Sequence, residues 1–150
     1  MKYTLTFYTT RLLKDWQAGV TMGLLIIIRP GYETDEGLYR HELTHVRQAC
    51  MFIVAGLIVG AMFLNHFPEY KFLPLLWGAL LGLMGNGLAY IFVRRYRAWA
   101  EAQAYAVQTQ FPDRSGGFLS VDGAAARLAL PQYDLALSVE QCRALIEAHL

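Results

Sequence analysis

Hydrophobic and polar positions follow a strand-like pattern over the first 30 residues of the chain. Apolar and polar side chains alternate over residues 2–8, which is the period-2 pattern of a half-buried strand. Residues 20–29 form a short apolar run that closes at Pro30 and Gly31, so they predict a second strand followed by a turn. The intervening residues 11–17 fit either a short helix or a loop.

From Thr34 onward the pattern becomes helical. Thr34 is a candidate N-cap, and Asp35 and Glu36 follow it in the first turn, where the helix dipole favours negative charge. The next strong break is the segment 65–68, which ends in proline. We therefore expect one long helix that is apolar on every side between residues 49 and 64.

A second apolar run covers residues 72–93 and contains no formal charge. It continues into residues 94–108, which are rich in helix formers, so the two stretches predict a single second helix. At 1.5 Å per residue the apolar run could cross the hydrocarbon core of a bilayer, which is about 30 Å thick. The first apolar run is only just long enough to do so.

The two apolar runs carry small residues four positions apart, which lets two helix backbones approach closely. These residues are Gly56 and Gly60 in the first run and Gly78 and Gly82 in the second. The sequence thus predicts an apolar helical hairpin over residues 49–93 with a short loop at 66–71. The alternative is a hairpin buried inside a soluble protein or against other subunits, where helices that are apolar all round also occur.

Arginines flank the predicted hairpin on the same side. Arg40 and Arg47 precede the first apolar run, and Arg94, Arg95 and Arg97 follow the second. By the positive-inside rule both ends of the hairpin lie in the cytoplasm. We expect a membrane protein with its termini on that side, and a soluble or virion-associated protein is the alternative.

Turn residues at 111–117 end the second helix, and a short apolar segment follows at 124–130 and stops at Pro131. Ser138 and Gln141 have the spacing of a capping box that opens a last helix, 139–149. We expect one domain over 1–150, mainly α with a small N-terminal β element, in which the hairpin 49–93 is an insertion and 118–150 is a helical tail.

Composition narrows the possible partners. Hydrophobic residues make up 55% of the 150 residues and charged residues 17%, which is more apolar than an ordinary soluble domain. The formal net charge of +1 gives no reason to expect nucleic acid as a partner. Cys50 and Cys142 are too few for a thiolate zinc site, and we expect a reduced pair rather than a disulfide.

Candidate chemistry lies in the polar part of the first helix, which reads His41-Glu42-Leu43-Thr44-His45. Residues four apart share one helix face, so His41 and His45 can bind one Zn²⁺ through ring nitrogens at about 2.0–2.1 Å. Glu42 then faces a metal-activated water and can take its proton as general base. This H-E-x-x-H pattern is typical of zinc hydrolases.

A catalytic zinc needs a third protein ligand, and the geometry of the hairpin favours Glu101. His66 and Glu69 lie on the far loop, roughly 30 Å from the histidines if the first helix is straight. The antiparallel second helix returns to the level of the histidines in the nineties, and Glu101 is its only acidic residue before Asp113. Tyr105, one turn further, is a possible donor to the oxyanion of a tetrahedral intermediate.

H-E-L-T-H, an apolar hairpin and then Glu101 with Ala104 in an E-x-x-A context together resemble the gluzincin metallopeptidases. The order is similar to that in membrane gluzincins of the CAAX-prenyl and heat-shock protease type, and to minimal bacterial and phage gluzincin-like domains. Members often carry an acidic residue four after the ligand glutamate, where this chain has Tyr105. The resemblance covers roughly residues 20–110.

The resemblance implies hydrolysis of a peptide or protein substrate, which would pair with an edge strand formed by residues 20–29. A buried core strand is the alternative there. A second hypothesis is a non-catalytic, zinc-stabilised module of a membrane complex or a phage particle. A third is a small membrane protein in which the motif is fortuitous.

Overall fold

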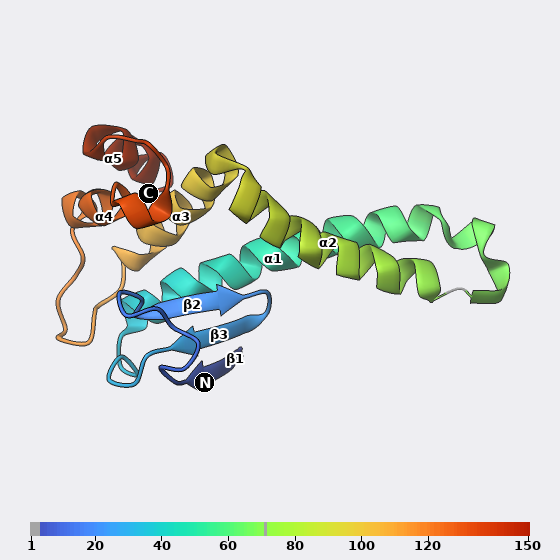
Figure 1. Ribbon diagram of the computed structural model, residues 1–150, viewed down its shortest axis with the longest axis horizontal. Coiled ribbons are helices and arrows are strands. Elements are labelled where there is room, and N and C mark those ends of the chain that lie inside the picture. Colours follow the sequence, from blue (N-terminus) through green and yellow to red (C-terminus); the bar gives the residue numbers. More distant parts are fainter. Residues whose placement is uncertain (1–3, 71) are drawn as a thin grey trace.

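A small sheet and three long helices make up most of the computed structural model, which describes residues 4–70 and 72–150 (Figure 1). The prediction of a mainly α fold with a small N-terminal β element is confirmed. The strands are β1 (Leu5–Tyr8), β2 (Gly19–Met22) and β3 (Leu25–Ile28). The helices are α1 (Glu36–Met62), α2 (Leu73–Phe92), α3 (Arg94–Gln108), α4 (Val121–Leu128) and α5 (Val139–Glu147), with 3-10 turns η1 (Leu64–His66), η2 (Pro68–Tyr70) and η3 (Pro131–Tyr133).

The sheet has the order β1-β3-β2, with β1 parallel and β2 antiparallel to β3. The single strand expected at 20–29 is wrong, because this run folds back on itself as a hairpin. Gly23, with a φ of +65°, allows the two-residue turn that separates β2 from β3. Residues 11–17 form turns rather than a helix, and residues 2 and 3 of the predicted first strand lie outside the described residues.

Helix α1 runs without a break from the H-E-x-x-H motif into the apolar segment, as predicted. Its N-cap is Asp35 and not Thr34, because the Asp35 carboxylate accepts a hydrogen bond from the Leu38 amide at 2.7 Å. Buried Ile26 and Ile28 of β3 pack against Leu38 and Val46 of α1. The sheet therefore covers one side of the first turns of α1.

Helices α1 and α2 form the predicted hairpin, and glycines set the distance between them. A Cβ added to Gly56 would lie 2.0 Å from the Gly78 carbonyl oxygen, and one added to Gly78 would lie 2.2 Å from the Gly56 carbonyl oxygen. Gly60 and Gly82 meet backbone carbonyls of the opposite helix in the same way. The prediction of close backbone approach at these four glycines is confirmed.

The second helix is not continuous, which corrects the expectation of one helix from 72 to 108. Val93 has an extended backbone, with φ −107° and ψ 93°, and it separates α2 from α3. A hydrogen bond of 2.6 Å from the Tyr96 hydroxyl to Asn86 Oδ1 joins the two helices across this break. The change of direction at Val93 carries α3 past the first turns of α1 (Figure 1).

The C-terminal helices hold α3 in place from its other side. Ala98, Ala102 and Ala106 of α3 share a buried core with Leu128 of α4 and Ile146 of α5. Helix α4 includes most of the apolar segment 124–130 and begins at Val121, where the Ser120 side chain caps it. The capping box at Ser138 and Gln141 is present, although α5 ends at Glu147.

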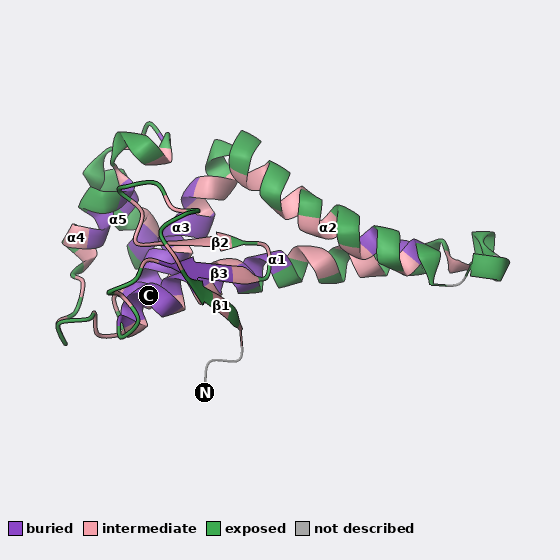
Figure 2. Cartoon of the chain, turned by 60° about the horizontal axis from the view of Figure 1, so that its bottom comes forward, coloured by how far each residue is buried: buried purple, intermediate pink, exposed green. Residues whose placement is uncertain are grey.

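The hairpin extends from this core as an arm whose surface is largely exposed (Figure 2). Two helices, Glu36–Met62 and Leu73–Phe92, are long and apolar enough to cross a membrane. Only 6% of the most apolar window of α2 is buried, so within this chain α2 is not a covered core helix. Cys50, on the arm, and Cys142, in the C-terminal core, are both free.

Candidate metal centre

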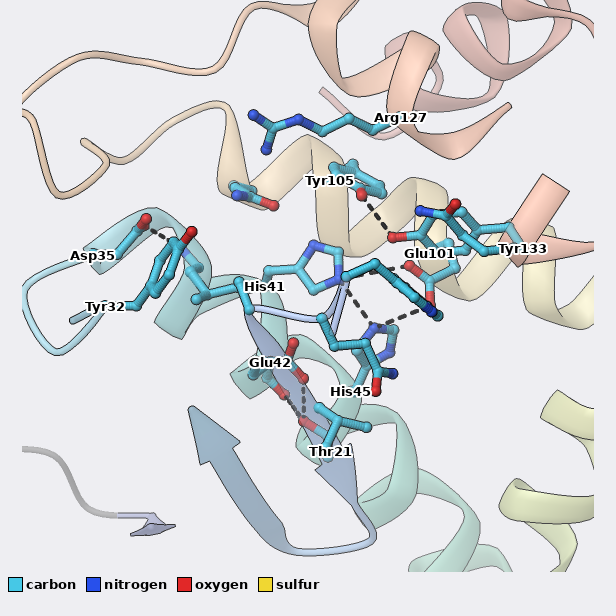
Figure 3. Close-up of a pocket in the computed structure, with 18 of the residues that line it drawn as sticks. Thr21, Tyr32, Asp35, His41, Glu42, His45, Glu101, Tyr105, Arg127 and Tyr133 are labelled. Atoms are coloured by element: carbon cyan, nitrogen blue, oxygen red, sulfur yellow. Dashed lines mark hydrogen bonds and ion pairs between the residues drawn. The ribbon is translucent and has the colours of Figure 1, made fainter. Parts of the chain in front are cut away.

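Three side chains from two helices meet at the base of the arm (Figure 3). His41 and His45 lie one turn apart on α1, with 3.3 Å between their Nε2 atoms. Glu101 of α3 reaches both rings, with Oε2 3.5 Å from His41 Nε2 and Oε1 3.5 Å from His45 Nε2. One ligand atom from each residue lies within 4.8 Å of the other two, so this group could bind a metal ion.

Glu101 is almost completely buried, with 3% of its surface exposed. Burial alone would raise the pKa of its carboxyl, but His45, His41 and the Tyr90 hydroxyl lower that pKa to about 2. The Tyr90 hydroxyl donates to Oε1, whereas Oε2 is buried without a hydrogen-bond partner. An anionic oxygen left without a donor beside two imidazole nitrogens fits a bound cation.

Glu42 lies beside the first histidine and faces strand β2. The Thr21 hydroxyl lies 2.8 Å from Glu42 Oε2 and 2.9 Å from the Glu42 carbonyl oxygen, both of which can accept its proton. A Cβ on Gly19 would lie 2.8 Å from Glu42 Oε1, so a larger residue there would displace the Glu42 carboxyl. Glu42 is buried, and this burial raises the pKa of its carboxyl to about 7.

Tyr105 lies where the sequence places it, one turn after Glu101. Its ring packs edge-on against His41, with 4.7 Å between the ring centroids. Its hydroxyl is 2.7 Å from the Tyr133 hydroxyl, a partner supplied by the short turn after α4. The structure thus pairs Tyr105 with a second tyrosine that sequence reasoning did not single out.

Two further residues around the centre were missed. Gln48 follows His45 by three positions, and its Oε1 lies 2.9 Å from His45 Nδ1. Tyr90 comes from α2 and contacts Glu101. The spacing of Gln48 on the helix face of His45 was a usable signal. Tyr90 had no such signal, because its position depends on the break at Val93.

The three-residue group opens into a cavity of about 1510 Å³. Strand β2, the second half of α2, and the segments after α3 and α4 contribute to its walls. Thr21, Glu42 and Tyr133 lie at the same cavity as the histidines (Figure 3). The arrangement therefore places a possible metal site and a carboxyl group with a raised pKa at one cavity.

The other acidic and histidine candidates do not join the group among the described residues. His66 and Glu69 lie in η1 and η2 at the far end of the arm, as the helix-length argument predicted. Comparison of the chain with protein-family models, curated proteins and solved structures gives no match.

Proposed function

We propose that this protein is a zinc-dependent metallopeptidase of the gluzincin type, with His41, His45 and Glu101 as metal ligands. The observation that carries the proposal is a three-member ligand group that opens into a cavity next to a buried glutamate. Within residues 4–70 and 72–150, no fourth histidine, cysteine or carboxylate joins the group. A site with three protein ligands keeps a position for water, as catalytic zinc sites do, whereas structural zinc sites are closed by four ligands.

When bound, zinc would supply a Lewis acid that polarises the scissile carbonyl and lowers the pKa of a water molecule. Glu42 takes the proton of the attacking water and later passes it to the leaving amine. A pKa near 7 suits both steps, because the carboxylate can accept a proton and the carboxylic acid can release it. The Thr21 hydroxyl holds Glu42 in place between these steps.

The substrate we propose is a peptide that adds to the free edge of β2. In the antiparallel pair β2–β3, the Arg29 amide donates a hydrogen bond to the Ala18 carbonyl oxygen. Hydrogen-bonded and non-hydrogen-bonded pairs alternate along such a ladder, so every second residue of β2 directs its backbone N–H and C=O groups away from β3. Those residues are Gly19 and Thr21, which also contact Glu42. An extended peptide paired with them would pass directly beside the general base.

Tyr105 and Tyr133 are proposed to stabilise the oxyanion that forms on the substrate. Two hydroxyl groups share one hydrogen bond, so the accepting hydroxyl keeps its own proton for another acceptor. Desolvation and the nearby Glu101 carboxylate raise the pKa of Tyr133, and desolvation raises the pKa of Tyr105, so both phenols keep their protons. The pair can therefore donate to developing negative charge.

We propose that the arm spans a membrane and that the termini and the metal centre lie on its cytoplasmic side. The exposed apolar surface of α2 and the second half of α1 supports this placement. Arginines at the base of the arm, including Arg47 and Arg94, agree with it because positive residues accumulate on the cytoplasmic side. The metal centre is then held just outside the bilayer.

The decisive experiment compares the wild type with Glu42→Gln in detergent. We expect the purified wild type to hold about one zinc per chain and to cleave members of a synthetic peptide mixture, as read by mass spectrometry. Glu42→Gln should keep the zinc and lose roughly 10²–10⁴-fold in rate, because the general base is missing. Full activity of this variant would contradict the mechanism.

A wild type that binds zinc with high affinity but cleaves no peptide would favour the zinc-stabilised structural module instead. In that case Glu101→Ala should unfold the base of the arm, and Glu42→Gln should leave folding intact. Absence of bound zinc from the wild type would exclude both functions.

A further inference from the structure

Gln48 connects the two helices that supply the ligand group. It is 3% exposed and lies on the same face of α1 as His45. Its Oε1 is 2.9 Å from His45 Nδ1, and its Nε2 donates to the Ala100 carbonyl oxygen at 3.1 Å and to Gln103 Oε1 at 2.9 Å. One buried amide thus contacts a candidate ligand on α1 and the residue before Glu101 on α3.

These contacts fix the orientation of the Gln48 amide. The Ala100 carbonyl oxygen can only accept a hydrogen bond, so the amide nitrogen of Gln48 must face it. The amide oxygen of Gln48 is then turned toward His45, and it too can only accept. His45 Nδ1 must therefore carry the proton, which leaves a lone pair on Nε2 of the neutral ring.

We propose that Gln48 is a positioning residue that holds His45 in the Nδ1–H tautomer, with Nε2 directed at the metal position. The backbone of α3 imposes this state through the Ala100 carbonyl. Docking of α3, which delivers Glu101, therefore also prepares His45. The inference rests on the proposed metal site, but the tautomer is a property of the metal-free protein and needs no peptidase activity.

His41 provides an internal reference for this role. Its Nδ1 atom is buried and has no hydrogen-bond partner in the described structure, and the hydrogen bonds of Gln48 go to His45, Ala100 and Gln103 instead. A change at Gln48 that acts through the hydrogen bond to His45 should leave the His41 tautomer unchanged. A change that disturbs the whole helix should affect both rings.

The test uses two substitutions that separate the contact to His45, made by the amide oxygen of Gln48, from the contacts to Ala100 and Gln103, made by its amide nitrogen. Gln48→Glu keeps an acceptor for His45 Nδ1 but loses the donor to Ala100 and Gln103, whereas Gln48→Leu loses all three contacts. Long-range ¹H–¹⁵N NMR of the metal-free, full-length protein at alkaline pH reads the tautomer of each neutral histidine. We expect the Nδ1–H form of His45 in the wild type and in Gln48→Glu, and a mixture of forms in Gln48→Leu.

Zinc affinity, measured by competition with a chelator, gives the second readout. Gln48→Leu should weaken zinc binding by about 10–100-fold, the usual effect of losing a partner that orients a ligand. Gln48→Glu should retain most of the affinity. Gln103→Leu is the matched control, because it removes a neighbour of Gln48 and leaves the bonds to Ala100 and His45; its His45 tautomer and zinc affinity should match the wild type.

Two results would overturn the proposal. One is a His45 tautomer that is the same in the wild type and in Gln48→Leu. The other is an equal loss of zinc affinity in Gln48→Glu and Gln48→Leu, which would mean that Gln48 only ties α1 to α3. Either result can be obtained whether or not the protein cleaves peptides, so a failure here is distinct from a failure of the proposed function.

Discussion

The two halves of α1 differ in which side chains they bury: the first half buries polar side chains, and the second half exposes apolar ones. In residues 36–49 the buried set includes His41, Glu42 and Gln48, and the sheet and α3 cover them. In residues 50–62 only Gly60 is buried, while large apolar side chains such as Met51 and Ile58 are at least 60% exposed. Figure 2 shows this change from a covered to an exposed helix.

One continuous helix thus has a covered half with buried polar side chains and an exposed half with apolar side chains. A buried polar group without a partner costs free energy, and at the base of the arm Thr21, Ala100 and Tyr90 provide partners for Glu42, Gln48 and Glu101. The exposed apolar half lacks such a cover and is stable where the surrounding medium is itself apolar. Under the proposed function, the arm anchors the site in the membrane and the base of the arm performs the chemistry.

The largest expected effect comes from a charge on the arm. Leu81 is 61% exposed near the middle of α2. If lipid surrounds it, Leu81→Lys should cost roughly 3 kcal/mol in membrane insertion, because a lysine at the centre of a spanning helix is poorly solvated. The measurement is the fraction of protein that remains in the membrane after an alkaline carbonate wash.

Leu12 offers a matched control, because it is 64% exposed but lies in the loop between β1 and β2. Leu12→Lys should leave membrane association unchanged, since surface substitutions in water usually change stability by less than about 0.5 kcal/mol. If both lysines behave alike, lipid does not surround the arm, and the contrast between the halves of α1 needs another explanation.

Sequence reasoning succeeded where the structural cause is local. The i, i+4 spacing of His41 and His45 fixes their common face, and the spacing of Gly56 and Gly60 fixes a close helix contact. The helix-length argument also brought Glu101 to the histidines, although it assumed a straight second helix.

The sequence predictions failed where contacts between residues far apart in the chain determine the structure. The break between α2 and α3 occurs at Val93, where the sequence has no proline or glycine that would predict it. A hydrogen bond from the Tyr96 hydroxyl to Asn86 connects the two helices across this break. Tyr90 and Tyr133 lie at the centre because the chain changes direction at Val93 and because the C-terminal helices pack against α3. Periodicity along one helix contains no information about such contacts.

The second prediction concerns Glu42 in the metal-free protein. Its folded pKa of about 7 lies above the value of 4.5 expected when unfolded, so the folded state binds the proton more tightly. The stability that protonated Glu42 contributes is therefore complete below pH 4.5 and is lost as the pH rises to 7. Above pH 7, metal-free Glu42→Gln should be more stable than the wild type by roughly 2–3 kcal/mol.

Thermal unfolding at acidic and at alkaline pH measures this difference. The gain in Glu42→Gln should vanish below pH 4.5, where the wild-type carboxyl is protonated in both states. It should also shrink when zinc is added, because a nearby cation stabilises the carboxylate. A gain that is independent of pH would show that burial of charge at Glu42 is not its cause.

The smallest effect on stability should come from the contact between the two helices of the arm, α1 and α2. Gly78→Ala places a Cβ 2.2 Å from the Gly56 carbonyl oxygen, so the helices must separate, at a cost of about 1–3 kcal/mol. A Cβ on Gly87, in the same helix, meets nothing within 4 Å. Gly87→Ala should therefore stabilise the protein slightly, by about 0.5–1 kcal/mol, because alanine favours the helix.

Zinc affinity and unfolding in detergent distinguish the roles of these two glycines. Because α2 leads into α3, separation of the helices at Gly78 should also shift Glu101 and weaken zinc binding, while Gly87→Ala should leave zinc affinity unchanged. If Gly78→Ala lowers stability but not zinc affinity, the arm and the metal centre are mechanically independent. If it lowers both, the exposed half of α1 helps to maintain the geometry of the buried half.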